Sequence, residues 1–328
     1  MQIRYINSFK LKLIHPFFCA NFSMASTTNQ YSPVFYVLLG AFLISFSGIL
    51  VKFAHVSPTA SGFYRVGFGT IFLLAGVLLK RELKIPTINQ LLLVAFCGMT
   101  FALDLFFWHE SIMYIGPGLA TLIGNFQVFL LAGIGILFLG EKSKLRFIIS
   151  IPLAIGGLFL IVGGNWAELD TSYRTGIYFA LLTALCYTIF LLTLRKIQQD
   201  RGQSFFLLLM FVSLATAIYL GLKMLYTGDT FAIPDNQSLL ALLGLGLFSQ
   251  TIGWILIATA MPKIPASLTG LALLLQPTLS FVWDVIIFSR PTDLVNWLGV
   301  IITLIAIYMG VTGKIAPATK VHSNSPDS

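Results

Sequence analysis

Ten long apolar runs, joined by short connections, limit how this chain can fold. They lie near residues 34–54, 61–79, 89–109, 117–139, 146–164, 175–194, 204–225, 238–260, 265–288 and 294–313. About 20 apolar residues cross a bilayer as a helix, and in lipid only helices and closed barrels satisfy every backbone group. Barrel strands would alternate polar and apolar residues, whereas these runs are continuous. The sequence therefore predicts an all-α integral membrane protein with ten transmembrane helices.

The composition agrees with a chain embedded in a lipid bilayer. Of its 328 residues, 57% are hydrophobic and 10% are charged, whereas about 25% are charged in an average soluble domain. The net charge of +8 does not indicate a nucleic-acid partner, because the basic residues sit in short loops between apolar runs. The three cysteines are scattered and form no CxxC pair. We therefore expect no disulfide, metal site or cofactor.

The distribution of lysine and arginine predicts the topology. If the N-terminus is inside and the helices alternate, fifteen basic residues fall in inside segments: Arg4, Lys10, Lys12, Lys80, Arg81, Lys84, Lys142, Lys144, Arg146, Arg195, Lys196, Arg201, Lys263, Lys314 and Lys320. Only Arg174, Lys223 and Arg290 fall outside, while Lys52 and Arg65 lie within apolar runs. Basic residues favour cytoplasmic loops. Both termini are therefore expected in the cytoplasm, with the protein in the cell (inner) membrane.

Two membrane-length segments, Gly116–Lys142 and Ile264–Arg290, resemble one another. Each opens with a proline beside a small residue, has a glutamine near its centre and ends in a polar break. With five runs per half, the second half must enter the membrane in the opposite direction. Inverted repeats are typical of secondary transporters, whose substrate site lies near the midplane between the repeats. We therefore predict two inverted five-helix repeats around a central cavity.

The predicted domain boundaries follow from this repeat. The first repeat covers 33–165 and the second covers 174–313, with cytoplasmic tails at 1–32 and 314–328. Within the first tail, Met24 opens a polar segment and is an alternative to Met1 as the start of translation.

Over roughly 33–313 the sequence resembles the EamA-type, ten-helix branch of the drug/metabolite transporter superfamily. In the first repeat the resemblance rests on Lys52, on Pro58–Leu74 with Arg65, and on Gly118–Lys142. In the second it rests on Pro265–Phe288 and on the last helix. It implies a carrier of small metabolites, often an exporter of amino acids or related compounds.

The two central segments depart from the family pattern at a few positions. The usual central proline is matched by Pro277, whereas Val128 or Phe129 stands there in the first copy. The closing Gly-Glu is kept at Gly140-Glu141 and replaced by Phe288-Ser289 in the second copy. The missing proline weakens any expectation of a bend in the first copy.

Polar groups inside the apolar runs are the candidate transport residues. Those expected to line a midplane cavity and bind solute are Asn125, Gln127, Gln250, Trp254 and Gln276. Gln250 and Trp254 are spaced i, i+4, so they share one helix face. Asn and Gln also serve as hydrogen-bonding contacts between helices, which is the alternative reading.

A second group is expected in the outer half of the membrane. It contains charged and aromatic residues, namely Lys52, Arg65, Asp104, Trp108, Trp283 and Asp284. Ionisable groups are costly in a bilayer and therefore mark functional sites. Other readings are that the tryptophans anchor at the interface, that Arg65 snorkels outward or forms an ion pair, and that Lys52 pairs with Asp104 or Asp284. His109 is expected at the outer interface.

These features predict a secondary transporter that moves a small metabolite across the membrane by alternating access. Export of an amino acid or related compound follows from the resemblance. Alternatives are a nucleotide-sugar or other organic-anion exchanger of the same superfamily, a channel, or an intramembrane enzyme. The sequence holds no P-loop, HExxH or GxSxG motif, so an ATP-driven pump and an enzyme are disfavoured. A proton is a candidate coupling ion, and the oligomeric state stays open.

Overall fold

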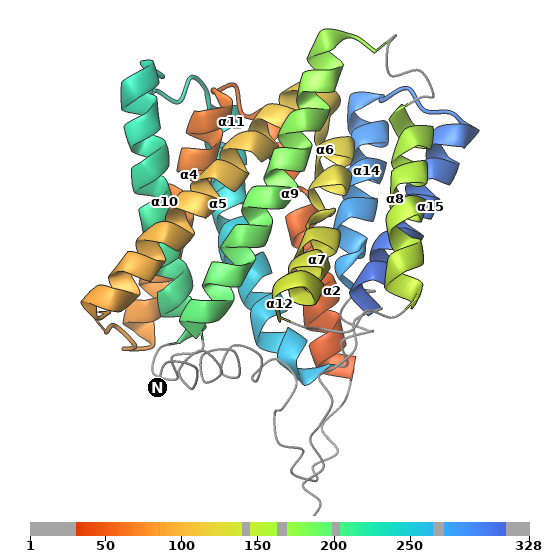
Figure 1. Ribbon diagram of the computed structural model, residues 1–328. Coiled ribbons are helices and arrows are strands. Elements are labelled where there is room, and N and C mark those ends of the chain that lie inside the picture. Colours follow the sequence, from red (N-terminus) through yellow and green to blue (C-terminus); the bar gives the residue numbers. More distant parts are fainter. Residues whose placement is uncertain are drawn as a thin grey trace, which may run out of the picture.

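A computed structural model describes residues 31–84, 86–139, 145–162, 169–198, 204–264 and 272–312. Within these ranges the chain forms helices and short connections without a strand (Figure 1), which confirms the all-α prediction. The predicted tails, except 31–32, and the Gly140-Glu141 motif lie outside the described residues, as do positions 265–271 of the second central segment.

The first half of the chain contains seven labelled helices, some of which are pieces of one apolar run. They are α2 (Tyr31–Ser45), α3 (Ser47–Phe53), α4 (Pro58–Leu79), α5 (Ile88–Ile115), α6 (Pro117–Gly124), α7 (Gln127–Leu139) and α8 (Leu145–Val162).

The second half contains helices of three kinds. The α-helices are α9 (Thr171–Gln198), α10 (Phe205–Thr227), α11 (Asn236–Gly244), α12 (Trp254–Ala260), α14 (Leu275–Phe288) and α15 (Leu294–Thr312). Between α11 and α12 runs the π-helix η2 (Leu245–Gly253), and the 3₁₀-helix η3 (Met261–Lys263) follows α12.

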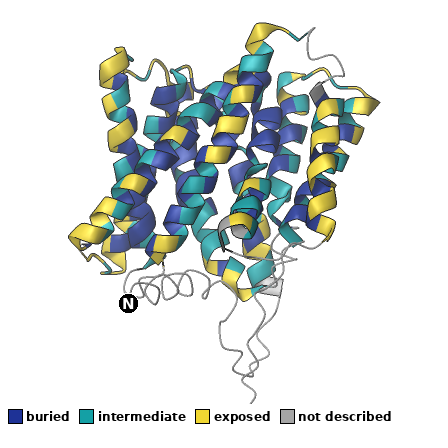
Figure 2. Cartoon of the chain, in the orientation of Figure 1, coloured by how far each residue is buried: buried dark blue, intermediate teal, exposed yellow. Residues whose placement is uncertain are grey.

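Eight helical segments in the described residues are long and apolar enough to cross a membrane. They are Pro33–Phe53, Pro58–Leu79, Ile88–Ile115, Pro117–Ile134, Thr171–Gln198, Phe205–Thr227, Asn236–Lys263 and Leu294–Thr312. Two shorter apolar helices, Leu145–Ile161 and Leu275–Phe288, accompany them. Figure 2 shows exposed positions on the outward faces of the bundle and buried positions between the helices. Because many exposed positions are large and hydrophobic, these faces suit lipid.

Polar side chains begin several helices by accepting hydrogen bonds from otherwise unpaired backbone N–H groups. Ser57 accepts from Ala60 at the start of α4, and Ser204 accepts from Leu207 at the start of α10. Asp235 begins α11, where it accepts from the backbone N–H of Ser238 at 2.7 Å. This hydrogen bond, together with a contact to His55 at 2.8 Å, holds the pKa of the Asp235 carboxyl below its usual range.

The first central segment is interrupted even though it lacks the proline of its second copy. α6 ends at Gly124 and α7 starts at Gln127. The side-chain amide of Asn125 donates to the carbonyl oxygen of Thr121 at 2.8 Å, so it satisfies an acceptor at the end of α6. The polar residue therefore marks the helix break that a proline would otherwise mark.

Helices of the first half pack mainly against helices of the second half. α4 contacts α10, α6 contacts α14, α8 contacts α15, and α5 runs beside α9. α2 lies against η2 and α12. Figure 1 shows the resulting bundle, with α4 and α10 at one side and α8 and α15 at the other. The contacts place the interior of the protein between the two halves.

The contact between α8 and α15 gives a test of this packing. A Cβ atom on Gly157 would lie 2.4 Å from Thr303 Oγ1 and 2.9 Å from the Gly299 carbonyl oxygen, whereas one on Gly156 would meet nothing within 4 Å. We expect Gly157→Ala to lower the free energy of unfolding by roughly 1–3 kcal/mol. Thermal unfolding of the purified protein measures this, with Gly156→Ala as the matched control. Equal stability of the two variants would contradict the described contact.

Candidate functional site

Arg65 is buried in the membrane-spanning part of α4 and is held by polar groups of the second half. Its exposed fraction is 5%. The Arg65 Nε donates to Gln250 Oε1 at 3.3 Å, and Gln250 Nε2 donates to Ser213 Oγ at 3.0 Å. Arg65 is on α4, Gln250 on η2 and Ser213 on α10. One hydrogen-bonded chain therefore connects three helices from both halves.

The π-helix brings Gln250 against α4. A π-helix in an otherwise α-helical segment often marks a functional position. The contact is tight: a Cβ atom on Gly69 would lie 2.5 Å from Gln250 Cγ, and one on Gly246 would lie 2.6 Å from Phe68 Cβ. Small residues on both helices are therefore needed for Gln250 to reach Arg65.

Asp104 supplies an opposite charge on α5, with 6% of its surface exposed. Arg65 and Asp104 interact electrostatically, but among the described residues no direct ion pair joins them. The half-buried Tyr187 on α9 lies within electrostatic range of both. A buried guanidinium and a buried carboxylate thus lie close together without neutralising each other by contact.

One of the predicted tryptophans, Trp108, lies beside Arg65. The guanidinium carbon of Arg65 lies 5.4 Å from the centroid of the Trp108 ring, a distance at which a cation is attracted to the ring face. Trp254 packs edge-on against Phe190 with centroids 6.0 Å apart. We call Arg65, Asp104, Trp108, Tyr187 and Gln250 the central cluster.

His109, which is expected at the outer interface, is fully buried against the start of α4. Its Nδ1 lies 3.1 Å from the carbonyl oxygen of Pro58, which can only accept a hydrogen bond. Nδ1 therefore carries the proton and Nε2 offers a lone pair. Nε2 is buried without a hydrogen-bond partner in the described part of the chain.

The amides of the two central segments take separate positions. Asn125 bonds within its own helix end, while Gln127 is half-buried with an Oε1 atom that has no partner among the described residues. Gln276 is half-buried in the first turn of α14. In the described residues, no hydrogen bond joins these three amides to the central cluster. Gln250 is therefore the one predicted midplane amide that contacts Arg65.

A second polar site lies at the end of the bundle where α14 stops, which the charge distribution predicts to be the outer end. Asp284 on α14 is 2% exposed and forms an ion pair with Arg290 at 3.2 Å. It also accepts from the backbone N–H of Gly118 at 3.1 Å. In the predicted topology Arg290 is only an outside charge, and its position six residues after Asp284 is the one sequence signal for this ion pair.

Two other predicted residues take roles at this end of α14. Lys52 is half-buried, with Nζ 4.4 Å from the centroid of the Phe288 ring and within electrostatic range of Asp284. Of the two suggested partners of Lys52, Asp104 and Asp284, it is therefore Asp284 that lies within its electrostatic range. Trp283 donates to Ser45 Oγ at 3.1 Å and stacks on Phe46 with centroids 5.0 Å apart. Its polar atom therefore connects α14 with α2.

In the described residues, no group of three or more His, Cys, Asp or Glu side chains could hold a metal ion. What the central cluster offers is one buried cation, one buried anion, an amide and aromatic faces. These are the kinds of group that orient a small polar solute in a binding site.

The fold and these sites define a multi-pass membrane protein with buried polar groups between two halves. The model of the EamA-like transporter family matches 31–163 and again 174–312. The chain belongs to this family and is therefore a transmembrane transporter, consistent with the resemblance to the drug/metabolite transporter superfamily.

Two further comparisons concern the chain as a whole. A search of curated proteins found no match. A solved structure described as "Crystal structure of protein" is similar over 86% of this chain and 98% of its own, with a TM-score of 0.62 and 16% identity. At that identity the likeness shows the fold alone.

Coupling between Arg65 and Asp104 is testable by a double-mutant cycle. Arg65→Met removes the cation and leaves the buried carboxylate without its counter-charge, which is more costly than removing both charges. We expect Arg65→Met and Asp104→Leu together to destabilise less than the sum of the single variants, with a coupling free energy of roughly 0.5–3 kcal/mol. Chemical or thermal unfolding measures it. Additive effects would show that the two charges do not interact.

Proposed function

We propose that the protein is a secondary transporter that moves a small metabolite across the cell (inner) membrane by alternating access. Ten transmembrane helices form two inverted repeats, 33–165 and 174–313, with both termini in the cytoplasm. The solute is an amino acid or a related compound, and the direction is export. The central cluster is the binding site, reached from each side in turn as the two halves rock against each other.

The helix pairing supports the inverted repeat. If the halves are related by a two-fold axis in the membrane plane, equivalent helices should meet across it. The second, fourth and fifth spans of the first half are α4, α6–α7 and α8, and their equivalents are α10, α14 and α15. Each contacts its equivalent. The contact of α5 with α9 is likewise matched by that of η2 and α12 with α2.

The observation that carries the proposal is that Arg65 and Asp104 are both buried and interact electrostatically, while no direct ion pair joins them in the described residues. Arg65 offers a planar fork of donors that fits a carboxylate, and Asp104 accepts from an ammonium group. A zwitterionic solute would satisfy both charges at once. The faces of Trp108 and Tyr187 then provide apolar contact for its remaining part, as expected for a small-molecule site.

An organic-anion or nucleotide-sugar exchanger is the second candidate. Arg65 favours it, because a guanidinium fork binds phosphate as well as carboxylate. Asp104 opposes it, because a like charge beside a bound anion costs free energy. A channel or an intramembrane enzyme has less support, since the two charges are buried between helices and not arranged in a ring around a pore. Asp104 is the candidate carrier of a coupling proton.

Transport by the purified protein in liposomes tests this proposal. We expect uptake or counterflow of a radiolabelled amino acid within a panel of amino acids, organic acids and nucleotide sugars. Gln250→Ala removes the partner of Arg65 and should lower the transport rate at least about tenfold, the effect of roughly 1.4 kcal/mol. Gln237→Ala, an exposed glutamine at the end of the bundle, is the matched control. Normal transport by Gln250→Ala would contradict the assigned site.

Asp104→Asn separates the two candidate substrates. It keeps the size of the side chain but removes the negative charge that would bind an ammonium group. We expect it to abolish transport of zwitterions and to leave or improve transport of organic anions. A pH-sensitive dye inside the liposomes shows in the same experiment whether protons move with the solute. Retained zwitterion transport by Asp104→Asn would contradict the role of this carboxylate.

A further inference from the structure

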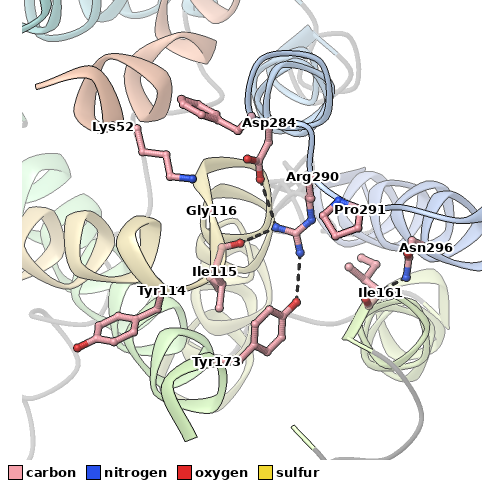
Figure 3. A pocket seen from close by; sticks show the side chains of 11 residues that line it. Lys52, Tyr114, Ile115, Gly116, Ile161, Tyr173, Asp284, Arg290, Pro291 and Asn296 are labelled. Carbon is pink, nitrogen blue, oxygen red and sulfur yellow. Dashed lines mark hydrogen bonds and ion pairs between the residues drawn. The ribbon is translucent and has the colours of Figure 1, made fainter. Parts of the chain in front are cut away.

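The outer end of the bundle contains a pocket of about 330 Å³ between the two halves. Its lining includes Lys52 from α3, Ile115 from α5, Tyr173 from α9, Asp284 from α14 and the following Arg290 (Figure 3). Its size is at the lower end of the range for small-molecule sites. The pocket therefore has room for a small solute.

The charges that line this pocket do not cancel. Lys52 and Arg290 are positive and Asp284 is negative, so the lining carries a net charge of +1. Figure 3 shows the amino group of Lys52 and the guanidinium of Arg290 both directed toward the region beside Gly116. One additional negative charge would neutralise the pocket, whereas a cation would increase the imbalance.

Arg290 holds the halves together at this pocket. Its Nη1 donates to Asp284 Oδ2 at 3.2 Å and to the carbonyl oxygen of Ile115, and its Nη2 donates to Tyr173 Oη at 3.1 Å. Asp284 in turn accepts from the backbone of Gly118. The second half is thus attached to the corner between α5 and α6 through two hydrogen bonds that depend on Arg290 and Asp284.

Two glycines make this attachment possible. Gly116 has a φ of +81°, which favours glycine, and a Cβ atom there would lie 2.6 Å from Asp284 Oδ2. A Cβ atom on Gly118 would lie 2.7 Å from Phe281 Cα. The Gly-Pro-Gly opening of the first central segment therefore allows α14 and Asp284 to approach the corner closely.

We propose that this outer pocket binds the carboxylate group of a small solute, and that Arg290 exchanges Asp284 for the bound carboxylate. The exchange breaks the ion pair between Asp284 and Arg290, which holds both side chains in place for their hydrogen bonds to the α5–α6 corner, and so favours opening of the outer end. The pocket is a second solute site, distinct from the central cluster. The opening step rests on the proposed transport function, whereas binding does not.

A carboxylate fits better than other ligand groups for two reasons. Arg290 already holds one carboxylate, that of Asp284, so its donors have the required directions. Lys52 provides a second cation. Its amino group contacts the Phe288 ring, and it forms no direct ion pair among the described residues. A solute carboxylate placed between these two cations would form charge-assisted hydrogen bonds, which are stronger than those to a neutral group.

Ligand-dependent thermal unfolding of the full-length protein in detergent tests this binding. The probes are acetate and its uncharged analogue acetamide, titrated at constant ionic strength against chloride. A ligand that binds only the folded protein raises Tm. We expect acetate to raise Tm by about 2–4 °C and acetamide to leave it unchanged. An equal response to acetamide or to chloride would overturn the proposal.

Matched lysine variants assign the response to the pocket. Lys52→Met removes a pocket cation without touching the Arg290 hydrogen bonds, and it should abolish the acetate response. Lys223→Met is the control, because Lys223 also lies 4.4 Å from a ring centroid, that of Phe106, but does not line the pocket. A full acetate response in Lys52→Met would overturn the proposal. Gln250→Ala should keep the acetate response even where it stops transport. Binding in the outer pocket and transport through the central cluster can therefore be refuted independently.

Discussion

The buried guanidinium of Arg65 is the constraint on which the rest of this structure depends. A charge in the bilayer interior is costly unless other groups surround it. Here those groups come from both halves of the chain, with Gln250 and Ser213 from the second and Asp104 and Trp108 from the first. The two halves must therefore stay in register around one side chain. The same group is the cation of the proposed solute site.

Close packing of helix backbones at small residues keeps the two halves aligned in this way. In lipid no hydrophobic driving force brings helices together, so small residues at their contacts are important. Gly69 and Gly246 let η2 contact α4 beside Arg65, while Gly116 and Gly118 let α14 contact the α5–α6 corner. Small residues therefore allow close contact between helices both at the central cluster and at the outer pocket. A transporter needs contacts that are specific yet separable, and contacts built on a few hydrogen bonds over small residues meet both needs.

Hydropathy and the repeat were sufficient to predict the helical membrane fold, because length and apolarity alone decide which segments suit lipid. They were not sufficient for the local features that form the sites. The π-helix around Gln250 packs closely against α4, and the break after Gly124 is marked by Asn125, but no proline marks either one. The burial of His109 likewise depends on another helix, because its Nδ1 donates to the carbonyl oxygen of Pro58 at the start of α4. Arg290 folds back onto Asp284 around a helix end, which loop charge counting does not consider.

Cys186 on α9 reports directly on alternating access to the central cluster, since it is 8% exposed and within electrostatic range of Asp104. In a chain with Cys19 and Cys97 replaced, a membrane-impermeant thiol reagent can be applied to each face of sealed vesicles in turn. Alternating access predicts slow labelling of Cys186 from both faces, and it predicts that Arg290→Gln speeds labelling from the outer face and slows it from the inner face. Labelling from one face alone, unchanged by Arg290→Gln, would contradict it.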